Sequence, residues 1–125
     1  MPHVPDHQQS EEMQACIEEC LECHRICEET LRYCLEQGGR HAEAAHIRLL
    51  LDCVQICATS ADFMARGSDL HAETCAVCAD VCERCAGDCE QFGDDPVMRA
   101  CAEACRRCAE SCRQMAGGMA FRKAA

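Results

Sequence analysis

Sixteen of the 125 residues are cysteines, and most of them recur at intervals of three and four residues. The densest run is Cys75, Cys78, Cys82, Cys85 and Cys89. At 3.6 residues per turn, this spacing keeps all five thiols on one helix face, at positions that leucine normally fills in a packed core. The same rhythm returns in Cys16, Cys20, Cys23, Cys27 and Cys34, in Cys101, Cys105, Cys108 and Cys112, and in the pair Cys53 and Cys57. Thiols repeated on the inward faces of helices predict a site for soft metal ions.

Explanations without a metal account for the thiols less well. Cysteines three or four residues apart on a helix have Cβ atoms ~5–6 Å apart, whereas a disulfide requires ~3.5–4.5 Å. Disulfides within one helix are therefore disfavoured, although bonds between facing helices stay open. Free cysteine does pack as a small hydrophobe, but so many small side chains at core positions would leave costly cavities. A bound metal would occupy that space.

Charge balance separates the candidate metals. Ferredoxin-type iron–sulfur proteins use a C-x2-C-x2-C-x3-C-P run, and no cysteine here precedes a proline. Four thiolates around each zinc ion would leave net negative charge in the interior, and the inward faces carry no lysine or arginine to offset it. Thiolates favour Cu(I), and one Cu(I) per thiolate makes a neutral interior. The residues favour multiple Cu(I) ions, about one per cysteine, with a zinc or cadmium buffer and an iron–sulfur redox protein as alternatives.

Four helices must position the thiols, with expected ranges of about 10–37, 40–65, 69–92 and 96–116. Ser10 is predicted to cap the first helix, Ser68 or Asp69 the third, and Asp95, followed by Pro96, the fourth. Short connections predict an all-α fold, an antiparallel up-down-up-down four-helix bundle with a cysteine-lined core. Residues 10–118 would form this single metal-binding domain, between a disordered tail at 1–9 and a frayed tail at 119–125.

The second expected helix is apolar around most of its circumference. Its apolar residues include Ile47, Leu49, Leu50, Leu51, Val54 and Ile56. A helix with this pattern is buried on more than one side, which a bundle of only four helices does not provide. We therefore expect a homo-oligomer that forms through this helix.

Composition excludes several classes of partner. The net charge is −10 and aromatic residues are only 3% of the chain, so neither a basic patch nor a stacking platform for nucleic acid is present. No leader-like segment or membrane-length apolar run is visible, so we expect a cytoplasmic protein whose thiols stay reduced. No acid–base pair or oriented nucleophile is visible, so we expect no enzymatic activity.

The helix faces continue beyond the cysteines into weaker soft donors. At one end of the expected bundle, the continuing residues are Met13, Met64, His71, Met115 and Met119. Thioether and imidazole groups suit transient capture of Cu(I), so this end is predicted to admit the metal, although methionines also serve simply to fill core gaps. At the other end, Leu50, Phe92 and Met98 are predicted to form an apolar plug, with His46 as a last ligand. His24 and His41 fall off these faces and are expected at the surface.

The repeated C-x3-C-x2-C-x3-C pattern resembles that of the bacterial copper storage proteins of the cytosolic type. The resemblance extends from about Met13 to Met119, and the pattern occurs on three of the four expected helices. It implies a four-helix bundle that holds many Cu(I) ions along its axis, usually as a tetramer. We therefore interpret the chain as a cytosolic Cu(I) storage and detoxification protein, with a copper chaperone as a candidate partner.

Overall fold

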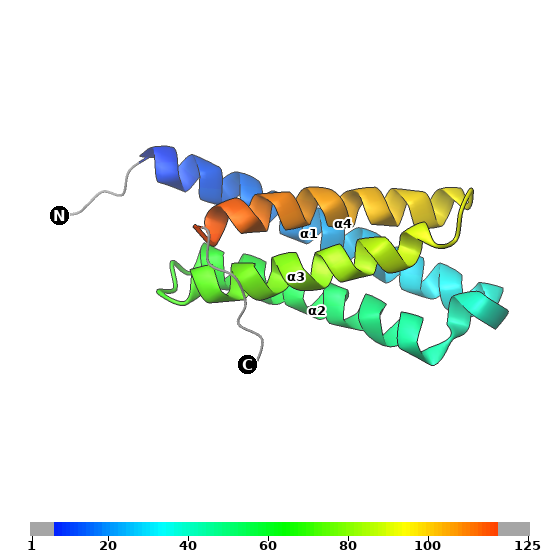
Figure 1. Cartoon of the computed structure of the whole chain (residues 1–125). Coiled ribbons are helices and arrows are strands. Elements are labelled where there is room, and N and C mark those ends of the chain that lie inside the picture. Colours follow the sequence, from blue (N-terminus) through cyan, green and yellow to red (C-terminus); the bar gives the residue numbers. More distant parts are fainter. Residues whose placement is uncertain (1–6, 118–125) are drawn as a thin grey trace, which may run out of the picture.

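The computed structural model describes residues 7–117, with side chains from residue 11 onward. Its elements are α1 (His7–Gln37), the 3-10 helix η1 (Gly39–Ala42), α2 (Ala44–Ala65), α3 (His71–Glu90) and α4 (Pro96–Met115). Within these residues there is no β-strand. Helix α1 packs on α2 and α4, and α3 packs on the same two helices (Figure 1). Successive helices are therefore antiparallel neighbours, which confirms the predicted four-helix bundle.

The start of α4 follows the predicted capping pattern. Asp95 Oδ1 accepts hydrogen bonds from the backbone amides of Val97 (3.0 Å) and Met98 (3.3 Å), and Pro96 occupies the first turn. These bonds satisfy amides that have no partner within the helix. Helix α1 instead begins at His7, three residues before the cap predicted at Ser10. Residues 1–6 and 118–125, which include most of the predicted tails, lie outside the described part of the chain.

The predicted starts of α2 and α3 need correction. Gly38 and Gly39 adopt positive φ values of 70° and 56°, and the chain then forms η1 before α2 begins at Ala44. Neither Ser68 nor Asp69 caps α3, which begins at His71 with no side-chain cap. The Ser68 hydroxyl accepts a hydrogen bond from the Leu70 amide within the preceding turn. Helix α3 also ends at Glu90, two residues before the predicted end at Phe92.

Thiols and alanines make up most of the interior. Each of the sixteen cysteines is at most 1% exposed. The alanines packed among them are Ala61, Ala76, Ala79, Ala86, Ala102, Ala109 and Ala116. Larger buried side chains stand nearer the two ends of the bundle, with Met64 at one end and Leu50 and Met98 at the other. The space between the helices is therefore lined by sulfur over most of its length.

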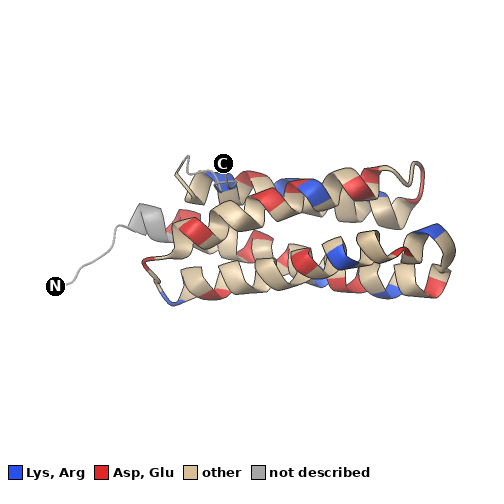
Figure 2. Cartoon of the chain, turned by 60° about the horizontal axis from the view of Figure 1, so that its bottom comes forward, with Lys and Arg blue, Asp and Glu red and all other residues tan. Residues whose placement is uncertain are grey.

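Acidic and basic residues are distributed along the helices (Figure 2), and none of the described Lys, Arg, Asp or Glu side chains is buried. Ion pairs link α3 to α4 through Glu83–Arg113 and Glu90–Arg106. Such exposed pairs contribute only ~0–1 kcal/mol each. None of the helices within residues 7–117 combines the length and apolar character needed to cross a membrane.

Candidate metal centre

The sulfur atoms of facing helices approach one another closely along the bundle axis. Their Sγ–Sγ distances are 3.5 Å for Cys20–Cys112, 3.6 Å for Cys57–Cys82 and 3.7 Å for Cys53–Cys82. All sixteen cysteines are free thiols, and these distances far exceed the ~2.0 Å of a disulfide bond. A closed-shell metal ion lies ~2.3 Å from thiolate sulfur, which places the sulfurs of one site ~3.5–4 Å apart. The interior therefore already has the spacing of a metal-thiolate site.

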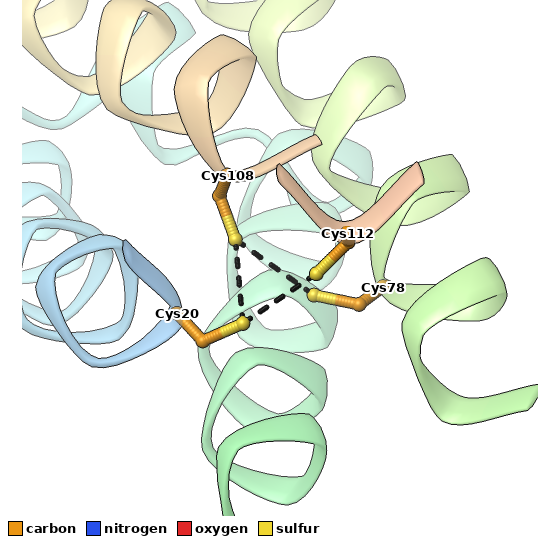
Figure 3. A group of neighbouring side chains, drawn as sticks. All are labelled: Cys20, Cys78, Cys108 and Cys112. Carbon is orange, nitrogen blue, oxygen red and sulfur yellow. Dashed lines mark hydrogen bonds between the residues drawn. The ribbon is translucent and has the colours of Figure 1, made fainter. Parts of the chain in front are cut away.

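Four sulfurs from three helices converge in one representative group (Figure 3). Cys20 lies on α1, Cys78 on α3, and Cys108 and Cys112 on α4, with all four sulfurs within 4.8 Å of one another. Neighbouring groups share members with it and with each other. Four further groups are Cys57–Cys78–Cys82–Cys108, Cys23–Cys53–Cys57–Cys82, Cys23–Cys27–Cys53–Cys105 and Cys27–Cys85–Cys101–Cys105. Because each group overlaps the next, the twelve thiols of these five groups form one continuous column, and a loaded column would use thiolates that bridge metal ions.

Hydrogen bonds among the thiols spread their pKa values. The thiol of Cys108 donates to Cys20, and this contact, together with Cys112, lowers the pKa of Cys20 to about 6. Bonds to Cys108, Cys23 and other neighbours raise the pKa of Cys57. Burial raises the pKa of Cys34 to about 11. The buried thiols therefore differ widely in pKa. A metal ion that binds them must displace protons that some thiols hold much more tightly than others.

The predicted methionine end is assembled from four helix ends. Met13 and Met64 line a surface cavity of about 310 Å³ together with Ile17. Met64 is almost fully buried, whereas Met115 and His71 are half-buried. The Nδ1 proton of His71 is donated to the Ser68 carbonyl at 3.0 Å, which leaves the Nε2 lone pair free for a metal ion. The predicted Met119 lies beyond the described residues.

The opposite end, predicted as an apolar plug with His46 as a last ligand, brings further soft donors beside that histidine. Cys34 Sγ lies 3.3 Å from His46 Nε2 and 3.6 Å from Met98 Sδ, so three soft donors meet there. The other ring nitrogen of His46 hydrogen-bonds Asp88 on α3. Phe92 covers this end, with its ring centroid 4.9 Å from that of His46.

Two histidines expected at the surface are half-buried instead. The Nδ1–H of His24 donates to the Val54 carbonyl of α2 at 2.9 Å. His41 lies 3.0 Å from Asp95 and packs against Phe92. Both contacts join segments far apart in the chain, so helical periodicity alone could not reveal them.

Sequence reasoning also missed two polar residues of the core and a half-buried carboxylate that contacts it. Thr30 and Ser60 continue the three-and-four spacing of α1 and α2, and that spacing could have identified them. Both are buried, and Ser60 Oγ lies 3.3 Å from Cys75 Sγ. No sequence spacing identifies Asp88, because its hydrogen-bond partner His46 lies 42 positions away in the chain.

Relatives of known structure share this bundle over nearly its whole length. A Nitrosospira multiformis protein is 44% identical, with a TM-score of 0.82 over 88% of this chain and 99% of that one. The Cu(I)-bound copper storage protein BsCsp3 is 41% identical, with a TM-score of 0.78 over 84% and 98% of the two chains. A cytosolic copper storage protein from Streptomyces lividans, solved with five coppers, is 30% identical, with a TM-score of 0.78 over 91% and 99%.

A curated relative and a family model add to this similarity. The cysteine-rich protein YhjQ of Bacillus subtilis is 42% identical over 65 residues, which span 52% of this chain and 60% of that protein. The family model described as copper storage protein matches residues 9–117. That range contains all sixteen cysteines of the bundle. The chain belongs to the copper storage protein family.

Proposed function

We propose that this protein stores Cu(I) in the cytosol, in a thiolate column that holds about one ion per cysteine, and thereby limits copper toxicity. The observation that carries the proposal is the overlap of the four-thiol groups, which leaves no gap between one site and the next. Relatives of this family have been solved with Cu(I) bound or loaded with five coppers, and one is described as cytosolic. Storage, rather than catalysis, fits a column in which every thiol is buried.

Charge argues against a divalent metal in the same column. Each Cu(I) that replaces a thiol proton leaves the charge of the interior unchanged, so many ions can load side by side. Zinc or cadmium held by four thiolates would accumulate buried negative charge. Within the described residues, the buried polar side chains are Thr30, Ser60 and His46. None of these is a lysine or arginine that could compensate the negative charge. The overlapping groups share thiolates between sites. This sharing suits Cu(I), whose thiolates can bridge ions, better than it suits zinc, which needs four thiolates per ion.

Anaerobic loading tests the storage function directly. Titration with Cu(I) against a competing chelator should bind about one ion per cysteine and release about one proton per ion. The loaded protein should be colourless and should keep its copper in the presence of excess zinc. Uptake of only a few ions, visible iron–sulfur absorption in the protein as purified, or displacement of copper by zinc would contradict the proposal.

We further propose that copper enters at the methionine end, past Met13, Met64, His71 and Met115. A thioether or imidazole binds Cu(I) more weakly than thiolate does, so an ion captured here can pass inward to Cys16, Cys75 or Cys112. The double substitution Met64→Leu with Met115→Leu should slow loading several-fold and leave the final stoichiometry unchanged. Met98→Leu at the far end is the control for rate. Equal loading rates in all three proteins would show that these donors play no part in entry.

We also propose a homo-oligomer with α2 as its contact, in the tetrameric form that the family resemblance implies. Leu51 on this helix is 42% exposed and adjoins a surface cavity that includes Val54 and Ala58. Ile47, Leu49 and Ile56 are only partly buried by the rest of the chain. A second copy would cover this apolar surface.

A further inference from the structure

Cys34 stands apart from the thiol column. On α1, Thr30 occupies the inward position between Cys27 and Cys34, and its hydroxyl donates to the Ile26 carbonyl at 2.8 Å. On α2, the fully buried Leu50 occupies the inward position between His46 and Cys53. A non-ligating side chain thus interrupts the donors on two of the four helices. The contacts of Cys34 are a histidine and a methionine, whereas the column cysteines contact one another.

We propose that Cys34, His46 and Met98 form a separate site for a single Cu(I) ion at the far end of the bundle. This proposal rests on the Cu(I) storage function and adds Met98 as a ligand and Asp88 as a positioning residue. The three donors come from α1, α2 and α4, and they are 0%, 5% and 0% exposed. One thiolate, one neutral imidazole and one thioether would give a neutral three-coordinate site for Cu(I).

The distances among the donors suit one ion. A closed-shell metal ion lies ~2.3 Å from sulfur and ~2.0 Å from imidazole nitrogen, so ligand atoms of one site are ~3.5–4 Å apart. Cys34 Sγ lies 3.3 Å from His46 Nε2 and 3.6 Å from Met98 Sδ. A shift of a few tenths of an ångström would admit the ion. Binding replaces the Cys34 thiol proton with Cu(I), the proton leaves to solvent, and no atom changes oxidation state.

Asp88 orients the imidazole for this task. Its carboxylate accepts the Nδ1 proton of His46, which fixes the tautomer whose Nε2 lone pair faces Cys34. A carboxylate behind a ligating histidine is a recurrent feature of metal sites, and its loss typically weakens metal binding ~10–100-fold. Phe92 packs against His46 with the two rings tilted by 45°, and the Arg40 guanidinium lies 4.5 Å from the centre of the Phe92 ring. These side chains close the site from outside.

Crystals of fully Cu(I)-loaded protein test the site at atomic resolution. An anomalous copper peak should lie within bonding distance of Cys34 Sγ, His46 Nε2 and Met98 Sδ. The proposal would be overturned by a copper peak bonded to Cys34 and column cysteines but not to His46 or Met98. The absence of a copper peak at Cys34 would also overturn it. Either of those results would leave the storage function intact if the column itself is filled. An empty column would instead refute the storage function.

Matched variants test the same site in solution. Met98→Leu conserves volume and should lower the capacity by one ion at chelator concentrations that leave the column loaded, whereas Leu31→Met, the reverse exchange at a partly buried position outside every proposed site, should keep the full number. In the wild type, the ¹⁵N resonance of His46 Nε2 should shift on loading. Asp88→Asn should alter that resonance before loading and should weaken the binding of one Cu(I) ion ~10–100-fold. An unshifted resonance would exclude His46 as a ligand, and equal capacity in Met98→Leu and Leu31→Met would exclude Met98.

Discussion

A buried cysteine behaves as a small apolar side chain until a soft cation replaces its proton. In this bundle the reduced thiols satisfy one another through weak hydrogen bonds, such as Cys23 with Cys105 and Cys78 with Cys57, both at 3.8 Å. The apo core therefore needs no metal to pair its polar atoms. Polar contacts at the helix ends, among them the Asp95 cap of α4, then stabilise the bundle around this core.

Asp95 is the clearest of those stabilising residues. Besides capping α4, its carboxylate accepts hydrogen bonds from Tyr33 Oη at 2.8 Å and from His41 Nε2 at 3.0 Å. Asp95→Ala should therefore lower the free energy of unfolding of the apo protein by ~2 kcal/mol, measured by chemical denaturation. Asp94→Ala, which alters the exposed neighbour, should change it little. Equal stabilities of the two variants would contradict this role.

The stabilisation by Asp95 should depend on pH in a defined direction. Burial alone would raise the pKa of Asp95, but the hydrogen bonds from His41 and Tyr33 hold it below its usual 3.8. A carboxylate with a lowered pKa stabilises the folded state fully above its unfolded value and loses this contribution as pH falls through the folded value. The difference between wild type and Asp95→Ala should therefore shrink below about pH 3.8.

At the scale of the helix, α2 supplies fewer thiols than its three neighbours. Its inward positions carry, in order, His46, Leu50, Cys53, Cys57, Ser60 and Met64. The same spacing that places cysteines on α1, α3 and α4 thus places a hydroxyl at Ser60. This single helix limits the capacity of the column at the methionine end.

Ser60→Cys should raise the capacity by about one Cu(I) per chain. The new sulfur would point toward Cys75, because Ser60 Oγ already lies 3.3 Å from that thiol. The measurement is anaerobic Cu(I) titration with a competing chelator. Thr59→Cys places a thiol at the adjacent exposed position and should add no ion that resists the chelator. If both variants or neither gained an ion, position 60 would not belong to the metal column.

At the scale of the whole molecule, α2 faces two environments. One face completes the column, and the other presents Leu51 and its partly buried apolar neighbours outward. A chain with net charge −10 repels its copies, so an assembly must bury enough apolar surface to offset that repulsion. The proposed α2 contact supplies such apolar surface through Leu51 and its neighbours.

Leu51→Glu should dissociate the oligomer, because it places a charge in the proposed apolar contact. Sedimentation velocity should show the mass fall from that of the assembly toward 13.8 kDa, the mass of one chain. Leu70→Glu, at the turn before α3, should leave the assembly intact, although Leu70 is 56% exposed. A wild-type protein that sediments as a monomer would refute the oligomer itself.

The sequence alone determined that four helices carry their thiols inward. A spacing of three and four residues keeps side chains on one face of a helix, and this periodicity is a local property of the chain. It also placed the α4 start, since Asp95 and Pro96 act within their own turn. Helix starts that depend on backbone conformation, such as that of α2 after Gly38 and Gly39, were less predictable.

Only the tertiary structure decided which donors meet. The shared sulfur groups, the pairing of His46 with Asp88, and the isolation of Cys34 behind Thr30 and Leu50 all join residues on different helices. The relative rotation and axial offset of packed helices set those contacts, and neither quantity is encoded in the spacing along any one helix.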